Sequence, residues 1–97
     1  MPRFMMIIAV MLLSFAGTAV AAEAPPGASS CSGCHPANAG VDTPVKRLNG
    51  QDAAQIVASM QAFRAGQRPA TVMDRIAKGF TDDEIKAIAA WYAAQKD

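Results

Sequence analysis

Two stretches of the chain repeat apolar residues at intervals of three and four, which is the spacing of one face of an α-helix. The first begins after Asp52, a candidate N-cap with Gln55 as its capping partner. It stops at Gly66, a residue type that commonly ends helices. Its apolar positions are Ala53, Ile56, Val57, Met60 and Phe63. The pattern predicts an amphipathic helix whose apolar face is buried.

The second stretch lies near the end of the sequence and has the stronger start signal. Thr81 is followed three residues later by Glu84, which is the pattern of a capping box. The apolar face of this stretch consists of Ile85, Ile88, Ala89 and Tyr92, with Trp91 adjacent. We expect a helix that runs to about Gln95, with acidic residues at its start, as the helix dipole favours.

The remaining segments show neither helical spacing nor the alternation of a β-strand. Residues 23–30 are rich in Pro, Gly and Ser and predict a flexible lead-in, and residues 36–50 predict an irregular loop. Pro69 predicts an extended segment over residues 68–73, before a short helical turn over residues 74–78. The predicted fold class is therefore all-α.

Residues 1–22 have the pattern of a secretory signal peptide. Arg3 provides a basic start, an apolar run follows to Val20, and small residues end at Ala22. An uncleaved membrane anchor is the alternative, although about seventeen apolar residues are at the lower limit for crossing a bilayer. Both interpretations place the rest of the chain outside the cytoplasm.

Charge and size narrow the classes of function. Beyond residue 22, eight Lys and Arg residues balance eight Asp and Glu residues, so nucleic-acid binding is not indicated. The roughly 75 residues that remain are a length at which a protein core alone provides little stability. An additional covalent or metal staple is therefore expected.

The segment Cys31-Ser32-Gly33-Cys34-His35 contains both cysteines and the only histidine of the chain. The pattern C-x-x-C-H is typical of c-type haem attachment. Residues three and four apart share one face of a helical turn, so Cys31, Cys34 and His35 can address one flat cofactor. The motif predicts one covalent haem c, with two thioethers to the porphyrin and an imidazole on the iron. Pro36 should end the turn near His35.

Two other interpretations of the motif remain. One is a disulfide or a redox-active dithiol between Cys31 and Cys34, although the strand–helix–strand pattern of thioredoxin-like proteins is not indicated. The other is a metal site, although a zinc site normally needs four ligands and the chain has no further Cys or His. Haem attachment is the favoured interpretation.

Only Met60 and Met73 lie beyond residue 22 as candidates for the second axial ligand of a haem iron. Met60 lies on an apolar helix face, which favours a core residue. Met73 lies in the segment that Pro69 makes extended, and we predict it as the ligand opposite His35, with core packing as its alternative.

An iron with both axial positions filled changes charge with little rearrangement, which suits an electron carrier that performs no bond chemistry itself. An open-iron haem protein that binds gas or catalyses a reaction is the first alternative. A haem-bearing sensor or accessory interaction domain is the second.

These residues resemble the class I cytochrome c family. The resemblance rests on the haem motif, on Pro44, Leu48 and Gly50 in the next loop, on Met73 after a proline-containing segment, and on Ala89-Ala90-Trp91-Tyr92. The stretch from Phe63 to Thr81 is more narrowly similar to the small cytochrome subunits of flavocytochrome c sulfide dehydrogenases, and less closely to cytochrome c4 domains. The resemblance covers essentially the whole chain after residue 22.

The resemblance implies a small class I cytochrome c fold over residues 31–97, in a periplasmic electron carrier rather than an enzyme. The implied site consists of the iron ligands His35 and Met73, the thioether cysteines Cys31 and Cys34, and the pocket walls Leu48, Phe63 and Ile88. A backbone carbonyl near Pro44 would accept the Nδ1 proton of His35, which orients the ring. The implied partner is a redox protein, and the narrower resemblance points to a flavoprotein sulfide dehydrogenase subunit.

One departure from the family concerns the segment before the haem motif. The family usually has a helix there that packs against an aromatic residue of the last helix, and Pro25-Pro26-Gly27 is unable to form it. We therefore expect a truncated N-terminal helix and an exposed aromatic face around Trp91. Such a face is typical of an interface, so we expect it to dock against another subunit or, as a homodimer, a second copy of the chain.

Six basic residues fall in the segments expected around the haem. They are Lys46, Arg47, Arg64, Arg68, Arg75 and Lys78. A basic rim of this kind can steer an acidic partner protein to an exposed haem edge. Acidic residues are interspersed, so an ordinary solvated surface is the alternative.

Overall fold

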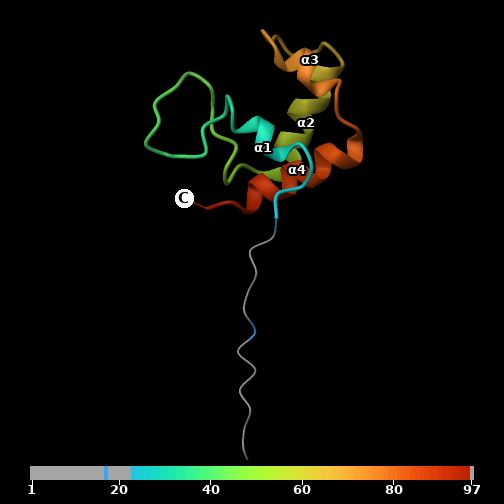
Figure 1. Cartoon of the computed structure of the whole chain (residues 1–97). Coiled ribbons are helices and arrows are strands. Elements are labelled where there is room, and N and C mark those ends of the chain that lie inside the picture. Colours follow the sequence, from blue (N-terminus) through green and yellow to red (C-terminus); the bar gives the residue numbers. More distant parts are fainter. Residues whose placement is uncertain (1–16, 18–22, 97) are drawn as a thin grey trace, which may run out of the picture.

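The computed structural model of the chain describes Gly17 and residues 23–96, so the predicted signal peptide lies almost wholly outside the described residues. The described part contains helices and no strand, which confirms the all-α prediction (Figure 1). In chain order the helices are α1 (Ala28–Cys31), α2 (Ala53–Arg64), α3 (Met73–Ala77) and α4 (Asp82–Ala94). None of the helices in this part is long and apolar enough to cross a membrane.

The two long helices begin at the predicted caps. The side chain of Asp52 accepts a hydrogen bond of 3.1 Å from the backbone N–H of Gln55 at the start of α2. At the start of α4, the Thr81 hydroxyl accepts from the N–H of Glu84 at 3.2 Å, and the Glu84 carboxylate accepts from the N–H of Thr81 at 2.9 Å. Both bonds of the capping box are therefore made, so donors that the first helical turn leaves unpaired are satisfied.

The core is small and lies where α1, α2 and α4 meet. Its buried residues are Ala28, Ile56, Ile88, Ala89 and Tyr92. Helix α2 packs against both α3 and α4, and in Figure 1 it stands with α3 near one end and α4 across the other. The loop of residues 36–50 extends to one side of this helical body (Figure 1).

The chain is ordered earlier than the sequence pattern indicates. Helix α1 begins at Ala28, inside the segment predicted as a flexible lead-in, and Ala28 is fully buried. Gly27 makes this possible, because its φ of +85° lets the chain turn directly after the two prolines. A β-carbon at Gly27 would lie 2.6 Å from the ring of Phe80, so the close approach also requires glycine. The truncated N-terminal helix is thus a single packed turn.

Two further expectations need correction. Met73 is not in an extended segment but is the first residue of α3, because the helix starts immediately after Val72. Trp91 is not a bare aromatic residue, since it is half-buried and packs against the core. Its ring meets Tyr92 edge-on, with 4.9 Å between the ring centroids and 85° between the planes. This contact and the packing against the core leave Trp91 only partly exposed.

The capping box makes the start of α4 sensitive to pH. The pKa of Glu84 lies below its ordinary value because the carboxylate accepts hydrogen bonds from the backbone and the side chain of Thr81. A lowered pKa in the folded state means that the contribution is present at neutral pH and disappears as the pH falls through that lowered pKa.

We predict that Thr81→Ala lowers the free energy of unfolding by about 1 kcal/mol, because the first turn of α4 then loses its cap. Urea unfolding followed by circular dichroism measures the change. Gln61→Ala, on the exposed face of α2, is the matched control and should leave the unfolding midpoint nearly unchanged. Equal midpoints for the two variants would contradict the prediction.

Candidate functional site

A cavity of about 480 Å³ lies between the C-x-x-C-H motif, α2, the segment around α3, and α4. This volume is in the range of small-molecule and cofactor pockets. Most of its lining is apolar, from residues that include Ile56, Val72, Ile76, Phe80, Ile85 and Ile88. Leu48 and Val45 of the 36–50 loop also line it, so the structure brings five separated parts of the chain to one apolar site.

Six of the seven site residues predicted from the sequence line this cavity. They are Cys31, Cys34, His35, Leu48, Phe63 and Met73. Pro44 is the exception, because it lies exposed in the loop and does not contact the cavity. Ile88, the further wall residue that the resemblance implied, also lines it.

The motif forms a compact turn at the end of α1. The N–H groups of Cys34 and His35 both donate to the carbonyl of Cys31, at 3.2 and 2.9 Å. This turn places Cys31, Cys34 and His35 together on the cavity wall, as helical spacing predicts. Both cysteines are free thiols in the structure. Burial raises the pKa of the Cys31 thiol, whereas Cys34 is exposed.

The orientation of His35 is determined by the loop. Its Nδ1 lies 2.5 Å from the carbonyl oxygen of Lys46, two residues beyond the predicted Pro44. A carbonyl only accepts hydrogen bonds, so Nδ1 carries the proton and Nε2 is left as the nitrogen that can bind a metal. A backbone acceptor of this kind orients the ring of a metal-binding histidine and determines which tautomer it adopts.

Both methionines of the described chain line the cavity. Met73 does so from α3, and Met60 does so from α2, and both side chains are half-buried. Met60 was expected to be an ordinary core residue, and its place on the cavity wall is a finding that the apolar stripe of α2 did not distinguish. The site thus offers an imidazole and two thioether sulfurs.

Several other lining residues escaped the sequence analysis. Among them are Val45, Gln51, Ser59 and Thr71, whereas Lys46 and Arg68, which also line the cavity, were expected only as members of the basic rim. Val45 and Lys46 belong to an irregular loop, where no periodicity marks the inner face. Ser59 and Gln51 are polar and carry no motif, so only the fold reveals their position.

The hydroxyl of Tyr92 joins α4 to the motif turn. It donates to the carbonyl of Ala28 at 2.5 Å, so the Ser32 hydroxyl, 2.9 Å away, donates to it in turn. The Tyr92 side chain is 1% exposed, and burial raises its pKa, so it remains a donor at neutral pH. Its backbone carbonyl also accepts from the N–H of Gly50, where the loop ends. Tyr92 is therefore hydrogen-bonded to both segments that flank His35, which are the motif turn and the end of the 36–50 loop.

Two residues of the predicted basic rim, Arg64 and Arg68, make contacts with other side chains of the protein. Arg68 places its guanidinium 4.8 Å from the centroid of the Phe63 ring and donates to the Ser59 hydroxyl at 2.8 Å. Arg64 forms an ion pair of 2.6 Å with Asp82. These two cations connect segments of the chain, so an ordinary solvated surface does not describe them fully.

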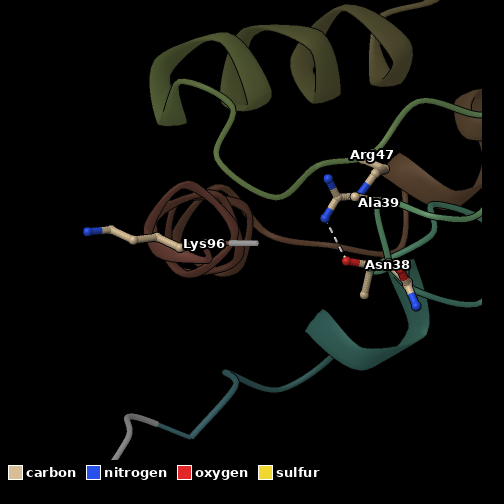
Figure 2. Close-up of a pocket in the computed structure, with 5 residues that line it drawn as sticks. Asn38, Ala39, Arg47 and Lys96 are labelled. Atoms are coloured by element: carbon tan, nitrogen blue, oxygen red, sulfur yellow. Dashed lines mark hydrogen bonds between the residues drawn. The ribbon is translucent and has the colours of Figure 1, made fainter.

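A second hollow of about 450 Å³ lies at the 36–50 loop, beside Lys96 (Figure 2). Arg47 donates across it to the carbonyl of Ala37 at 2.7 Å. The hollow contains none of the predicted site residues. The bond between Arg47 and Ala37 connects the two sides of the loop that supplies the Lys46 carbonyl.

The described fold and cavity define a small helical protein with a C-x-x-C-H attachment turn. No family model matches the chain. It is 36% identical over 85 residues to cytochrome c-554(548) of Halomonas halodenitrificans, a match that covers 84% of this chain and all of that protein. The chain belongs to the cytochrome c family.

Two longer proteins are also similar. One is the cytochrome subunit of sulfide dehydrogenase from Chlorobaculum tepidum, 35% identical over 63 residues, which are 65% of this chain and 57% of that protein. The other is a thiosulfate dehydrogenase electron acceptor from Stutzerimonas stutzeri, 39% identical over 67 residues, which are 65% of this chain and 31% of that protein. The matches span little more than half of the first protein and about a third of the second. These relatives confirm the prediction of an electron-carrying cytochrome rather than a catalytic subunit.

The residues of the cavity fit the covalent haem c that the family carries. Cys31 and Cys34 would form the thioethers, and the free Nε2 of His35 would bind the iron, within walls that are mostly apolar. When bound, haem c supplies an iron that takes up and releases one electron. The chain would supply the attachment points at Cys31 and Cys34, the orientation of His35 and mostly apolar walls.

We predict that Tyr92→Phe lowers the free energy of unfolding by about 1–3 kcal/mol, because the buried carbonyl of Ala28 loses its donor. Urea unfolding of the haem-loaded protein measures the change. Ser32→Ala removes the other, more exposed hydroxyl and should cost less. A Tyr92→Phe protein as stable as the unchanged one would show that this bond is not significant.

Proposed function

We propose that the chain is a periplasmic electron-transfer protein that carries one haem c, with His35 and Met73 as the axial ligands of its iron. One observation carries this proposal: the two cysteines, His35 and Met73 all line the same apolar cavity. The single C-x-x-C-H motif supports one haem. The signal-like residues 1–22 support export to the periplasm.

The surroundings of the two methionines favour Met73 over Met60. Met60 is in the middle of the twelve-residue helix α2, whose position is already determined by its packing against α3 and α4. Met73 begins the five-residue helix α3, where the neighbouring Val72 and Ile76 are 50% and 42% exposed although both line the cavity. Exposed apolar side chains on a cavity wall are typical of a wall that packs on a ligand. The wall formed by α3 is therefore better suited to close on a haem.

Ligation by both His35 and Met73 would favour electron transfer over substrate chemistry. A thioether is a soft ligand that stabilises the reduced iron and raises the reduction potential. With both positions occupied, no site remains for a gas or a substrate. The open-iron alternative would apply if neither methionine were a ligand.

For the electron donor, we propose a dehydrogenase that oxidises a reduced sulfur compound. The first candidate is a flavoprotein that oxidises sulfide, supported by the similarity to the cytochrome subunit of sulfide dehydrogenase. A thiosulfate dehydrogenase is the second candidate, supported by the similarity to an electron acceptor of that enzyme. In either case the haem protein would take electrons one at a time and pass them on.

We predict that Met73→Ala abolishes the weak near-infrared band of sulfur-to-iron(III) ligation, while the haem stays covalently attached through Cys31 and Cys34. Visible and near-infrared spectra of the oxidised protein test this, and a mass measurement counts the haems. Met60→Ala is the matched control and should retain the band. Loss of the band in Met60→Ala and not in Met73→Ala would indicate that Met60 is the ligand. Absence of the band in the unchanged protein would favour the open-iron alternative.

We predict that the oxidised protein, isolated from the periplasmic fraction, is reduced rapidly by a sulfide-oxidising flavoprotein in the presence of sulfide. Stopped-flow absorbance at the haem bands measures the rate. A thiosulfate dehydrogenase with thiosulfate is the parallel assay. Reduction no faster than by sulfide or thiosulfate alone would exclude the respective enzyme as the donor.

A further inference from the structure

The segment that carries Met73 leaves the body of the protein at the end of α2 and returns at the start of α4. Arg64, the last residue of α2, connects these two points. Its Nη1 donates to Oδ1 of Asp82 at 2.6 Å, and its Nη2 donates to the carbonyl oxygen of Phe80 at 2.7 Å. Residues 65–79 therefore form a segment, here called the excursion, whose two ends are joined by the Arg64 side chain.

The geometry of this closure depends on the guanidinium. Two different nitrogens reach two acceptors, and one acceptor is a backbone carbonyl, so the contact determines position as well as charge. The Arg64 side chain is 31% exposed, whereas that of Asp82 is 60% exposed. An ion pair with so exposed a carboxylate contributes little by itself. The bond to the Phe80 carbonyl is thus the more important of the two for positioning.

The closed excursion forms one wall of the cavity. Phe80, at its base, and Ile76 and Met73, on α3, all line the cavity. A second attachment connects the first part of the excursion to α2, because Arg68 donates to Ser59 and lies over Phe63. Release of the Phe80 end would leave α3 held by Arg68 and by its own packing on α2.

We infer that Arg64 is a positioning residue that keeps residues 65–79 closed over the cavity and thereby holds Met73 at the iron. This inference rests on the proposed function, in which Met73 is the ligand. Arg64 itself does not line the cavity. Its effect would therefore appear in how often Met73 leaves the iron rather than in the cofactor's attachment.

Added imidazole measures this effect, because it binds the oxidised iron only when Met73 has left. Its apparent dissociation constant falls in proportion to the rise in the population of the open form. We expect Arg64→Ala to bind imidazole about tenfold more tightly than the unchanged protein, which is the effect of losing one charge-assisted hydrogen bond. Titration of the haem-loaded protein, followed by loss of the near-infrared band, provides the value.

Three further variants make the test specific. Arg64→Lys keeps the charge but not the two-pronged geometry, so it should show an intermediate change, and it is the variant to use if Arg64→Ala does not fold. Asp82→Asn leaves the bond to Phe80 available and should bind imidazole nearly as the unchanged protein does. Tyr92→Phe removes a bond to the motif turn rather than to the segment that carries Met73, and shows how much a general loss of stability changes imidazole binding.

An excess of imidazole affinity in the Arg64 variants over Tyr92→Phe, at comparable global stability, would support the inference. Equal affinities would overturn it and leave the proposed function intact, provided that Met73→Ala has abolished the near-infrared band. Persistence of that band in Met73→Ala would overturn both, because imidazole would then compete with a different ligand.

Discussion

This chain buries a small core beside a large apolar cavity, and the rest of the structure is arranged around that cavity. The buried core is a handful of residues at the meeting point of three helices, and beside it lies a cavity of about 480 Å³ with mostly apolar walls. Apolar side chains such as Val72 and Ile76 remain exposed on this wall. The hydrophobic stabilisation that they would provide is obtained only when something flat and apolar lies against them. The covalent cofactor of the cytochrome c family is of this kind, and bound in this cavity it would complete the core.

The elements that could be predicted from the sequence are those that depend on neighbours in the chain. The caps at Asp52 and Thr81 are correct because each is a contact over three residues. The grouping of the motif side chains is correct because a helical turn determines it. The packed start at Ala28 depends on contacts with α4, and Trp91 packs against a core to which α1 and α2 contribute, and no local pattern reports such contacts. The acceptor for His35 was expected near Pro44 and is the carbonyl of Lys46, because an irregular loop has no period from which to count.

The basic residues illustrate how composition can mislead. Their sequence positions suggested a charged rim around the cofactor, but of the six only Lys46 and Arg68 line the cavity. Arg64 and Arg68, however, donate hydrogen bonds to groups on other segments, where a flexible surface lysine would have no such partners. Their planar, multi-donor groups suit the connection of segments that have little hydrophobic contact. In this protein, whose core is small, some charged side chains therefore connect one segment of the chain to another.

The bond from Tyr92 to Ala28 joins residues that are 64 positions apart. During synthesis the attachment turn emerges well before α4, so this tie cannot form until the last helix has been made. Closing so long a loop is also slow compared with local helix formation. The two cysteines therefore belong to an untied segment in every nascent or unfolded chain. Haem attachment through the two thiols would therefore be possible before Tyr92 of the last helix ties down the attachment turn.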